Sequence, residues 1–234
     1  MKFCIIGDSW GTNHPKQFNY GCLSNELIAR GHDVLNISAG GGSNFGQLQN
    51  LVCQVLEKNN VDFDYIIWML GEPSRDFTEF ISLDFGNDEL AGKSQFPEMT
   101  FNDLYKDLKY IEYRNYLFAQ EIYDKFKIPF IIIGCSGSIT NFSENFNFAK
   151  WRLKSWNQEI CGLTEMPVNC YRTHIKLMIE YGKYDEIVAT EELTRQSILY
   201  ELMRTTGNKN YPDGFHPSTE LYIELVGRIL NAIK

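Results

Sequence analysis

The chain has 234 residues, of which 44% are hydrophobic and 22% charged, values that are ordinary for a folded globular protein and exclude an extensively disordered one. Its formal net charge of -8, without a block of lysines and arginines, argues against a nucleic-acid backbone or an anionic membrane as the partner. No apolar run approaches the roughly 20 residues of a membrane helix, and no shift in composition marks a second domain. We therefore expect a single domain spanning residues 1–234, with a small molecule or a glycan as its ligand.

Six cysteines are scattered along the chain, and none belongs to a C-x-x-C pair. We expect reduced thiols in the core and no metal site, because no histidine or cysteine pair has the spacing of metal ligands. Residues 3–6 are too short for the apolar core of a signal peptide, which favours a protein that is cytoplasmic or otherwise not exported by a cleaved signal. Such a protein could also belong to a larger particle, and the sequence indicates no oligomeric state. The cysteines are Cys4, Cys22, Cys53, Cys135, Cys161 and Cys170.

The first apolar run, residues 3–6, predicts a buried parallel strand that stops at a turn, Gly7-Asp8-Ser9-Trp10-Gly11. Open α/β sheets keep their chemistry at the carboxyl ends of the strands. Ser9 is therefore a candidate catalytic residue. The alternative is that Asp8 and Ser9 only cap a following helix.

A helix is predicted up to Arg30 and a second strand over residues 33–37. This strand leads into Ser38 to Asn44, which contains three consecutive glycines before a helix that directs Leu48, Leu51, Val52 and Val55 inward. Such a loop lets backbone amides converge on an anion or a polarised carbonyl, although it could be only a tight turn. It lacks the spacing of a P-loop, so we expect no nucleotide and no other cofactor.

The third strand is predicted over residues 64–70, and it ends in another loop, residues 71–76. Residues 77–100 have little periodicity, which is typical of a lid, a binding loop or an oligomer contact. A long helix over residues 102–127 and a fourth strand over residues 129–133 follow.

The region 136–181 is irregular, and we expect short helices and at most one short strand in it. An amphipathic helix is predicted over residues 190–205. A last helix follows Pro217, with Leu221, Leu225, Val226, Ile229 and Leu230 facing the core. Helices that alternate with parallel-type strands predict a doubly wound α/β/α sandwich.

A carboxylate and an imidazole stand three residues apart in Asp213-Gly-Phe-His216, just before the last helix. At this spacing a turn can bring the two side chains side by side, so that Asp213 accepts the Nδ1 proton and leaves Nε2 of His216 as a base. With Ser9 as nucleophile this is the logic of a catalytic triad. The alternative is a polar helix cap without catalytic function.

Together these blocks resemble the SGNH hydrolase family, also called GDSL-type esterases, over the whole chain from Gly7-Asp8-Ser9 to Asp213 and His216. The resemblance implies a flavodoxin-like three-layer fold with a central parallel sheet of about five strands. It implies Ser9 as nucleophile, His216 as general base and Asp213 as the residue that orients it. Gly41 would supply an oxyanion-hole amide alongside that of Ser9.

The third block departs from the family pattern, because this chain has Gly71-Glu-Pro-Ser where the family has Gly-x-Asn-Asp. Pro73 takes the place of the asparagine that donates to the oxyanion, and proline has no such donor. Either Ser74 or Arg75 substitutes for it, or backbone amides form the whole oxyanion hole. Arg75 could instead pair with Asp76 or a neighbouring carboxylate at the surface.

These features predict a serine esterase that hydrolyses an ester, with an O-acetyl group on a carbohydrate as the favoured substrate. The alternative is a binding or structural protein that kept the fold and lost turnover through the changed third block. An acyltransferase on the same scaffold would differ only in whether water or an alcohol accepts the acyl group.

Overall fold

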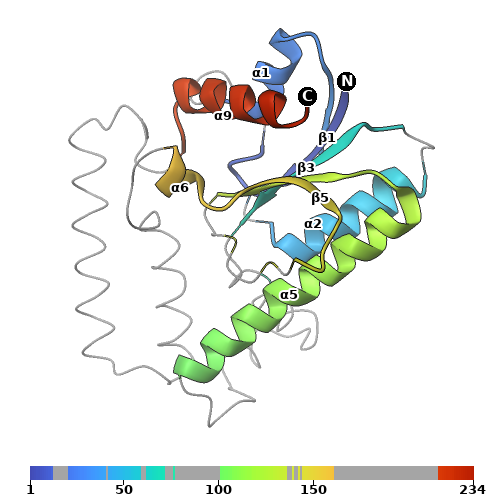
Figure 1. Ribbon diagram of the computed structural model, residues 1–234, viewed down its shortest axis with the longest axis vertical. Helices are drawn as coiled ribbons and strands as arrows, with labels where there is room; N and C mark the ends of the chain where they lie inside the picture. Colours follow the sequence, from blue (N-terminus) through green and yellow to red (C-terminus); the bar gives the residue numbers. More distant parts are fainter. Residues whose placement is uncertain are drawn as a thin grey trace.

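A computed structural model describes residues 1–12, 21–40, 42–58, 62–71, 76, 101–135, 139, 142, 144–160 and 216–234. Five parallel strands form one sheet in the order β2-β1-β3-β4-β5 (Figure 1). The strands are β1 (Lys2–Gly7), β2 (Asp33–Asn36), β3 (Tyr65–Leu70), β4 (Phe130–Gly134) and β5 (Ala149–Leu153).

Helices cover both faces of this sheet, which gives the three layers predicted for the chain (Figure 1). One face carries α1 (Leu23–Ala29) and α9 (Thr219–Ala232), with the short α6 (Trp156–Glu159) beside them. The other face carries α2 (Asn44–Asn50), its continuation η1 (Leu51–Leu56) and the long α5 (Phe101–Phe126). The strand order is that of flavodoxin-like folds, so the predicted fold class is confirmed.

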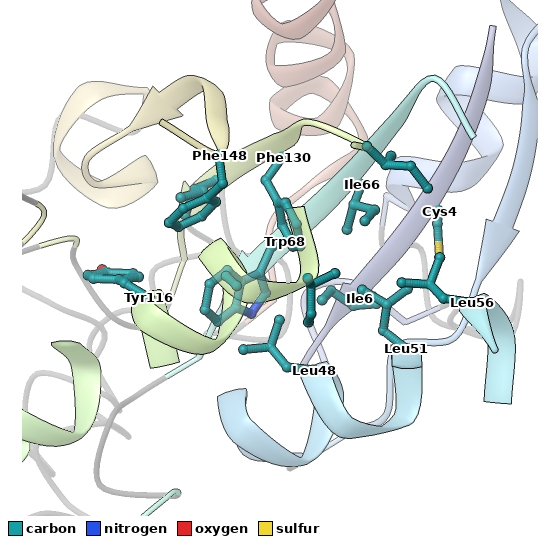
Figure 2. Close-up of a cluster of buried hydrophobic side chains, with 14 of the residues drawn as sticks. Cys4, Ile6, Leu48, Leu51, Leu56, Ile66, Trp68, Tyr116, Phe130 and Phe148 are labelled. Atoms are coloured by element: carbon teal, nitrogen blue, oxygen red, sulfur yellow. The ribbon is translucent and has the colours of Figure 1, made fainter. Parts of the chain in front are cut away.

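Side chains of β1 explain why the sheet is buried on both faces. Phe3 and Ile5 pack into the cluster beneath α9, whereas Cys4 and Ile6 pack into the cluster beneath α2 and α5. This alternation follows from the two-residue repeat of a strand. Figure 2 shows the second cluster, where Trp68 of β3 lies among the labelled side chains, with Leu48 of α2 on one side. Trp68 also meets the rings of Tyr116 and Phe130 edge-on, at centroid distances of 6.1 and 6.2 Å.

The order of the strands reverses between β1 and β3. The connection that follows β1 leads to β2 on one side, whereas the connection that follows β3 leads to β4 on the other. In open α/β sheets the crevice at this reversal, beyond the carboxyl ends of the strands, is where ligands bind. The loops that follow β1, β2 and β3 therefore begin side by side, at the carboxyl end of the parallel strands.

Two details differ from the sequence-based expectations. Residues 51–56 form a π-helix, in which Leu56 is buried while Val52, expected to face inward, is only half-buried. Cys53, expected in the core, is exposed on this helix, whereas Cys4, Cys22 and Cys135 are buried.

The remaining predictions about the elements concern the irregular region, the insertion, the helix over residues 190–205 and membrane-spanning segments. The strand β5 lies in the region expected to be irregular. The insertion 77–100 and the helix expected over residues 190–205 lie outside the described residues. Among the helices that the structure describes, none has both the length and the apolar character of a membrane-spanning segment.

Candidate functional site

Ser9 lies in a tight turn at the carboxyl end of β1. The carbonyl of the buried Asp8 accepts hydrogen bonds from the amides of Gly11 and Thr12, at 2.9 and 3.2 Å. The Asp8 side chain accepts from the amide of Trp10 at 2.9 Å, and the Thr12 hydroxyl donates to the Ser9 carbonyl at 2.8 Å. Asp8 therefore closes the turn that presents Ser9. Of the helices that the structure describes, the first, α1, begins at Leu23.

The loop after β2 is fastened to this turn. The Asn36 amide donates to the Gly11 carbonyl at 2.6 Å, and its oxygen accepts from the Ser38 amide at 3.0 Å. The Ala39 amide donates to the Gly7 carbonyl at 3.0 Å. Glycine is required at position 11, because a Cβ atom there would lie 2.5 Å from the Ser38 hydroxyl. The first and second loops thus form one connected surface at the end of the sheet.

Within the second loop the amide of Gly42 donates to the Ala39 carbonyl at 3.0 Å, which closes a tight turn. Ser43 then caps α2, accepting from the Gly46 amide at 3.0 Å. Gly41, the predicted oxyanion-hole residue, lies outside the described residues.

α9 connects His216 to the Ser9 turn. His216 is half-buried with its Nε2 shielded from solvent, and it stands two residues before Ser218, the N-cap of α9. The Tyr222 hydroxyl, in the first turns of α9, donates to the Trp10 carbonyl at 2.7 Å. Trp156 packs edge-on against both rings, with centroid distances of 5.5 Å to Trp10 and 4.9 Å to Tyr222. The residue after Ser9 and the helix after His216 are therefore joined through buried side chains.

Gly21 allows this end of α9 to approach α1 closely. A Cβ atom on Gly21 would overlap the Tyr222 ring and lie 2.8 Å from the Cα atom of Thr219. The chain therefore passes directly against the first turn of α9 just before α1 begins.

A buried polar network links the second loop to the third. The Asn44 side chain pairs with the backbone of Gly71 in both directions, donating to its carbonyl at 3.1 Å and accepting from its amide at 2.9 Å. Asp76, only 2% exposed, accepts from the Phe45 amide at 2.7 Å and from the side chains of Asn115 at 2.7 Å and Asn44 at 3.4 Å. Burial raises the pKa of Asp76 although these hydrogen bonds act in the opposite direction.

This environment of Asp76 differs from the alternative in which it forms an exposed pair with Arg75. The carboxylate is buried against α2 and α5. Arg75 itself lies outside the described residues.

The described residues place two of the predicted site residues, Ser9 and His216, in segments that meet at the carboxyl edge of the sheet. Asp213, Gly41, Ser74 and Arg75 lie outside the described residues, so their roles stay predictions. The described residues hold no group of three or more histidine, cysteine, aspartate or glutamate side chains suited to a metal ion.

Sequence reasoning missed the residues that hold these loops together, which are Asn36, Asn44, Asp76, Asn115 and Tyr222. One signal was present for Asn115. It stands four residues after Ile111 and seven before Ile122, both buried, so it is a polar residue on the apolar face of α5. A polar side chain at such a position requires a buried partner.

Comparisons with known proteins find similar folds. No family model matches the chain, and no curated protein sequence matches it. Solved structures are similar over nearly the whole chain. TesA matches 100% of this chain and 98% of its own, with 15% identity and a TM-score of 0.42. The psychrotrophic esterase EstA from Pseudoalteromonas sp. matches 99% and 96%, with 13% identity and a TM-score of 0.43. The acetyl xylan esterase AlAXEase matches 100% of both chains, with 14% identity and a TM-score of 0.40. At such values neither an activity nor a residue role follows from the likeness.

Proposed function

We propose that this protein is a serine esterase in which Ser9 is the nucleophile and His216 the general base. The observation that carries the proposal is the hydrogen bond from the Tyr222 hydroxyl to the Trp10 carbonyl, at 2.7 Å. It fastens the helix that follows His216 to the turn that presents Ser9, at the edge of the sheet where this fold class places its chemistry.

In the proposed reaction the Ser9 hydroxyl attacks the carbonyl carbon of the ester while its proton passes to Nε2 of His216. The alcohol then leaves with that proton, and the acyl group stays on Ser9. Water, activated by the same imidazole, attacks the acyl-enzyme and releases the acid. Asp213, three residues before His216, would hold the imidazole by accepting its Nδ1 proton.

The proposed oxyanion hole consists of the backbone amides of Ser9 and Gly41. A third donor is in question because Pro73 stands where the family has an asparagine. Ser74 or Arg75 would substitute for it, and a guanidinium could stabilise the developing charge with several donors.

For the substrate we propose an ester of a small alcohol or a sugar, with an O-acetyl group on a carbohydrate as the favoured case. The acidic chain and its lack of a basic block favour such a ligand over a polyanion. Pro73 favours a second candidate, a binding or structural protein on the same fold with slow or no turnover, because losing one oxyanion donor costs about 100- to 1000-fold in rate.

Labelling with a fluorophosphonate followed by peptide mapping separates these two functions. An activated Ser9 reacts and gives a phosphonylated peptide that contains residue 9, and the variant S9A gives none. The variant H216A should also lose the label, because the base is needed to activate the hydroxyl. Heat-denatured protein serves as the control for nonspecific reaction. Native protein that labels no more than the denatured control would refute the esterase and leave the binding protein.

A further inference from the structure

We propose that Asp76 is a positioning residue of this site: its buried carboxylate fixes the start of α2 against α5 and, through Asn44, holds the backbone of Gly71 where the third loop begins. The inference rests on the proposed esterase function, because its consequence is the spacing of the second and third loops around the oxyanion. Asp76 belongs to the buried polar network that links the second loop to the third, and the sequence motifs give it no part in the reaction.

The carboxylate joins two helices that are far apart in the sequence. On α2 it accepts from the Phe45 backbone amide at 2.7 Å, and on α5 it accepts from the Asn115 side-chain amide at 2.7 Å. A third donor, the side-chain amide of Asn44, lies at 3.4 Å. Three N–H groups thus converge on one side chain, and an ionised carboxylate, which only accepts, is the group suited to receive them all.

Asn44 transmits this constraint to the third loop. One hydrogen of its NH2 group is directed to the Gly71 carbonyl and the other to Asp76, while its oxygen accepts from the Gly71 amide. Both donors of Asn44 are therefore committed, and it has no further hydrogen to give to a substrate. Asn44 belongs to the scaffold that carries the oxyanion hole rather than to the hole itself.

Gly71 connects this scaffold to the residues that are predicted to contact the oxyanion. It follows β3 directly, and the residues proposed as substitute donors, Ser74 and Arg75, come three and four positions later. Gly41 lies three residues before Asn44 in the second loop. A clamp on Asn44 and Gly71 therefore controls the separation of the two loops that would surround the oxyanion. A misplacement of about 1 Å can cost about 100-fold in rate.

Stability alone does not account for a carboxylate at this position. Asp76 is 2% exposed, and a buried charge costs free energy unless hydrogen bonds compensate it. Burial raises the pKa of Asp76 although hydrogen bonds from Phe45, Asn115, Asn44 and Ser43 lower it, so the charged form is penalised in the folded protein. A group retained at such a cost at the carboxyl edge of the sheet is consistent with a positioning role.

Amide hydrogen exchange in the variant D76N tests the clamp without relying on activity. The asparagine presents an NH2 group where donors converge, so the Phe45 amide should exchange at least about 10-fold faster than in the wild type. If Asp76 also holds Asn44, the Gly71 amide should accelerate with it. The matched control is D124N, the same charge change at an exposed position of α5, which should leave both amides unchanged. Wild-type exchange at Gly71 in folded D76N would overturn the proposal.

The variant N44A keeps the test decisive if D76N does not fold. It removes the link while Asp76 can still accept from Phe45, so Gly71 should lose protection and Phe45 should keep it. Ester hydrolysis supplies the second readout: kcat should fall about 10- to 100-fold in both variants with KM within about twofold, since the loss is one of transition-state geometry. Unchanged kcat would overturn the catalytic consequence. A wild-type protein without Ser9-dependent turnover would refute the esterase itself, and the exchange result would then decide the clamp alone.

Discussion

The hydrogen bond from Tyr222 to Trp10 offers the sharpest test of the proposed site, because one oxygen atom can be removed without disturbing the packing. Tyr222 is fully buried, and its ring lies edge-on to Trp156 at 4.9 Å. The variant Y222F keeps the ring and deletes only the hydroxyl that donates to the Trp10 carbonyl at 2.7 Å. It therefore isolates the connection between α9 and the Ser9 turn.

The expected magnitude follows from the chemistry of a buried hydrogen bond. Such a bond contributes about 1 kcal/mol net, and a buried carbonyl that loses its partner raises the cost to about 1–3 kcal/mol. In a chain of this length that loss corresponds to a fall in Tm of about 2–10 °C. Removing the whole ring in Y222A should cost more, about 3–5 kcal/mol, because the contact with Trp156 is lost as well.

Urea denaturation gives the change in the free energy of unfolding, and p-nitrophenyl acetate hydrolysis gives kcat. The matched control is Y110F, which deletes the hydroxyl of a tyrosine that is 69% exposed and should leave both quantities unchanged. We expect Y222F to lower kcat by about 10-fold through displacement of His216 relative to Ser9. A variant as stable and as active as the wild type would refute the claim that this bond aligns the two segments.

Three further predictions concern the reaction and its pH dependence. S9A and H216A should each abolish ester hydrolysis while circular dichroism stays unchanged, because triad members act as a unit; turnover in S9A at the wild-type rate would exclude this nucleophile. R75A or S74A should lower kcat about 100-fold if that residue donates to the oxyanion, and a kcat equal to that of the wild type in both variants would leave only backbone donors. The third concerns Asp76, whose pKa is raised by burial. At a pH above the usual pKa of an aspartate, the folded protein keeps a proton that the unfolded chain has lost. The free energy of unfolding therefore falls as the pH rises through that window. D76N cannot titrate there, so wild-type stability relative to D76N should decline as the pH rises above 3.8, the ordinary pKa of an aspartate, and urea titrations that give a constant difference would contradict this.

The sequence predicted the central strands well for a physical reason. β1, β3 and β4 are covered on both faces, so burial requires nearly continuous apolar runs such as those of residues 3–6 and 65–70. β5 is an edge strand in which half-buried and exposed residues alternate, and its sequence Ala-Lys-Trp-Arg-Leu carries too little apolar signal over five residues to be distinguished from a loop.

Helix η1 shows a different limit of periodicity. The expected apolar stripe assumed 3.6 residues per turn and placed Val52 and Val55 inward. Residues Leu51–Leu56 instead form a π-helix, in which Val55 is buried as expected, Leu56 is buried as well and Val52 is only half-buried. A π-helical turn is defined by its hydrogen bonds rather than by residue type, so the apolar pattern did not predict it.

The candidate site also contains some residues that sequence motifs mark and others that only the packing reveals. The places of Ser9 after a strand and of His216 before a helix were predictable, because short sequence motifs mark strand ends and helix starts. Asp76 was not, because whether a carboxylate is exposed or buried depends on the donors that the fold brings to it. Those donors come from Asn44 and Phe45 on one helix and from Asn115 on another, 39 positions further along the chain than Asp76. Of these four residues only Asn115 has a local signature, a polar residue on an apolar helix face, and such a residue indicates that a partner exists without identifying it. The motifs therefore locate the proposed reaction, whereas the groups that would set its geometry are found only from the packing of α2 and α5 against the sheet.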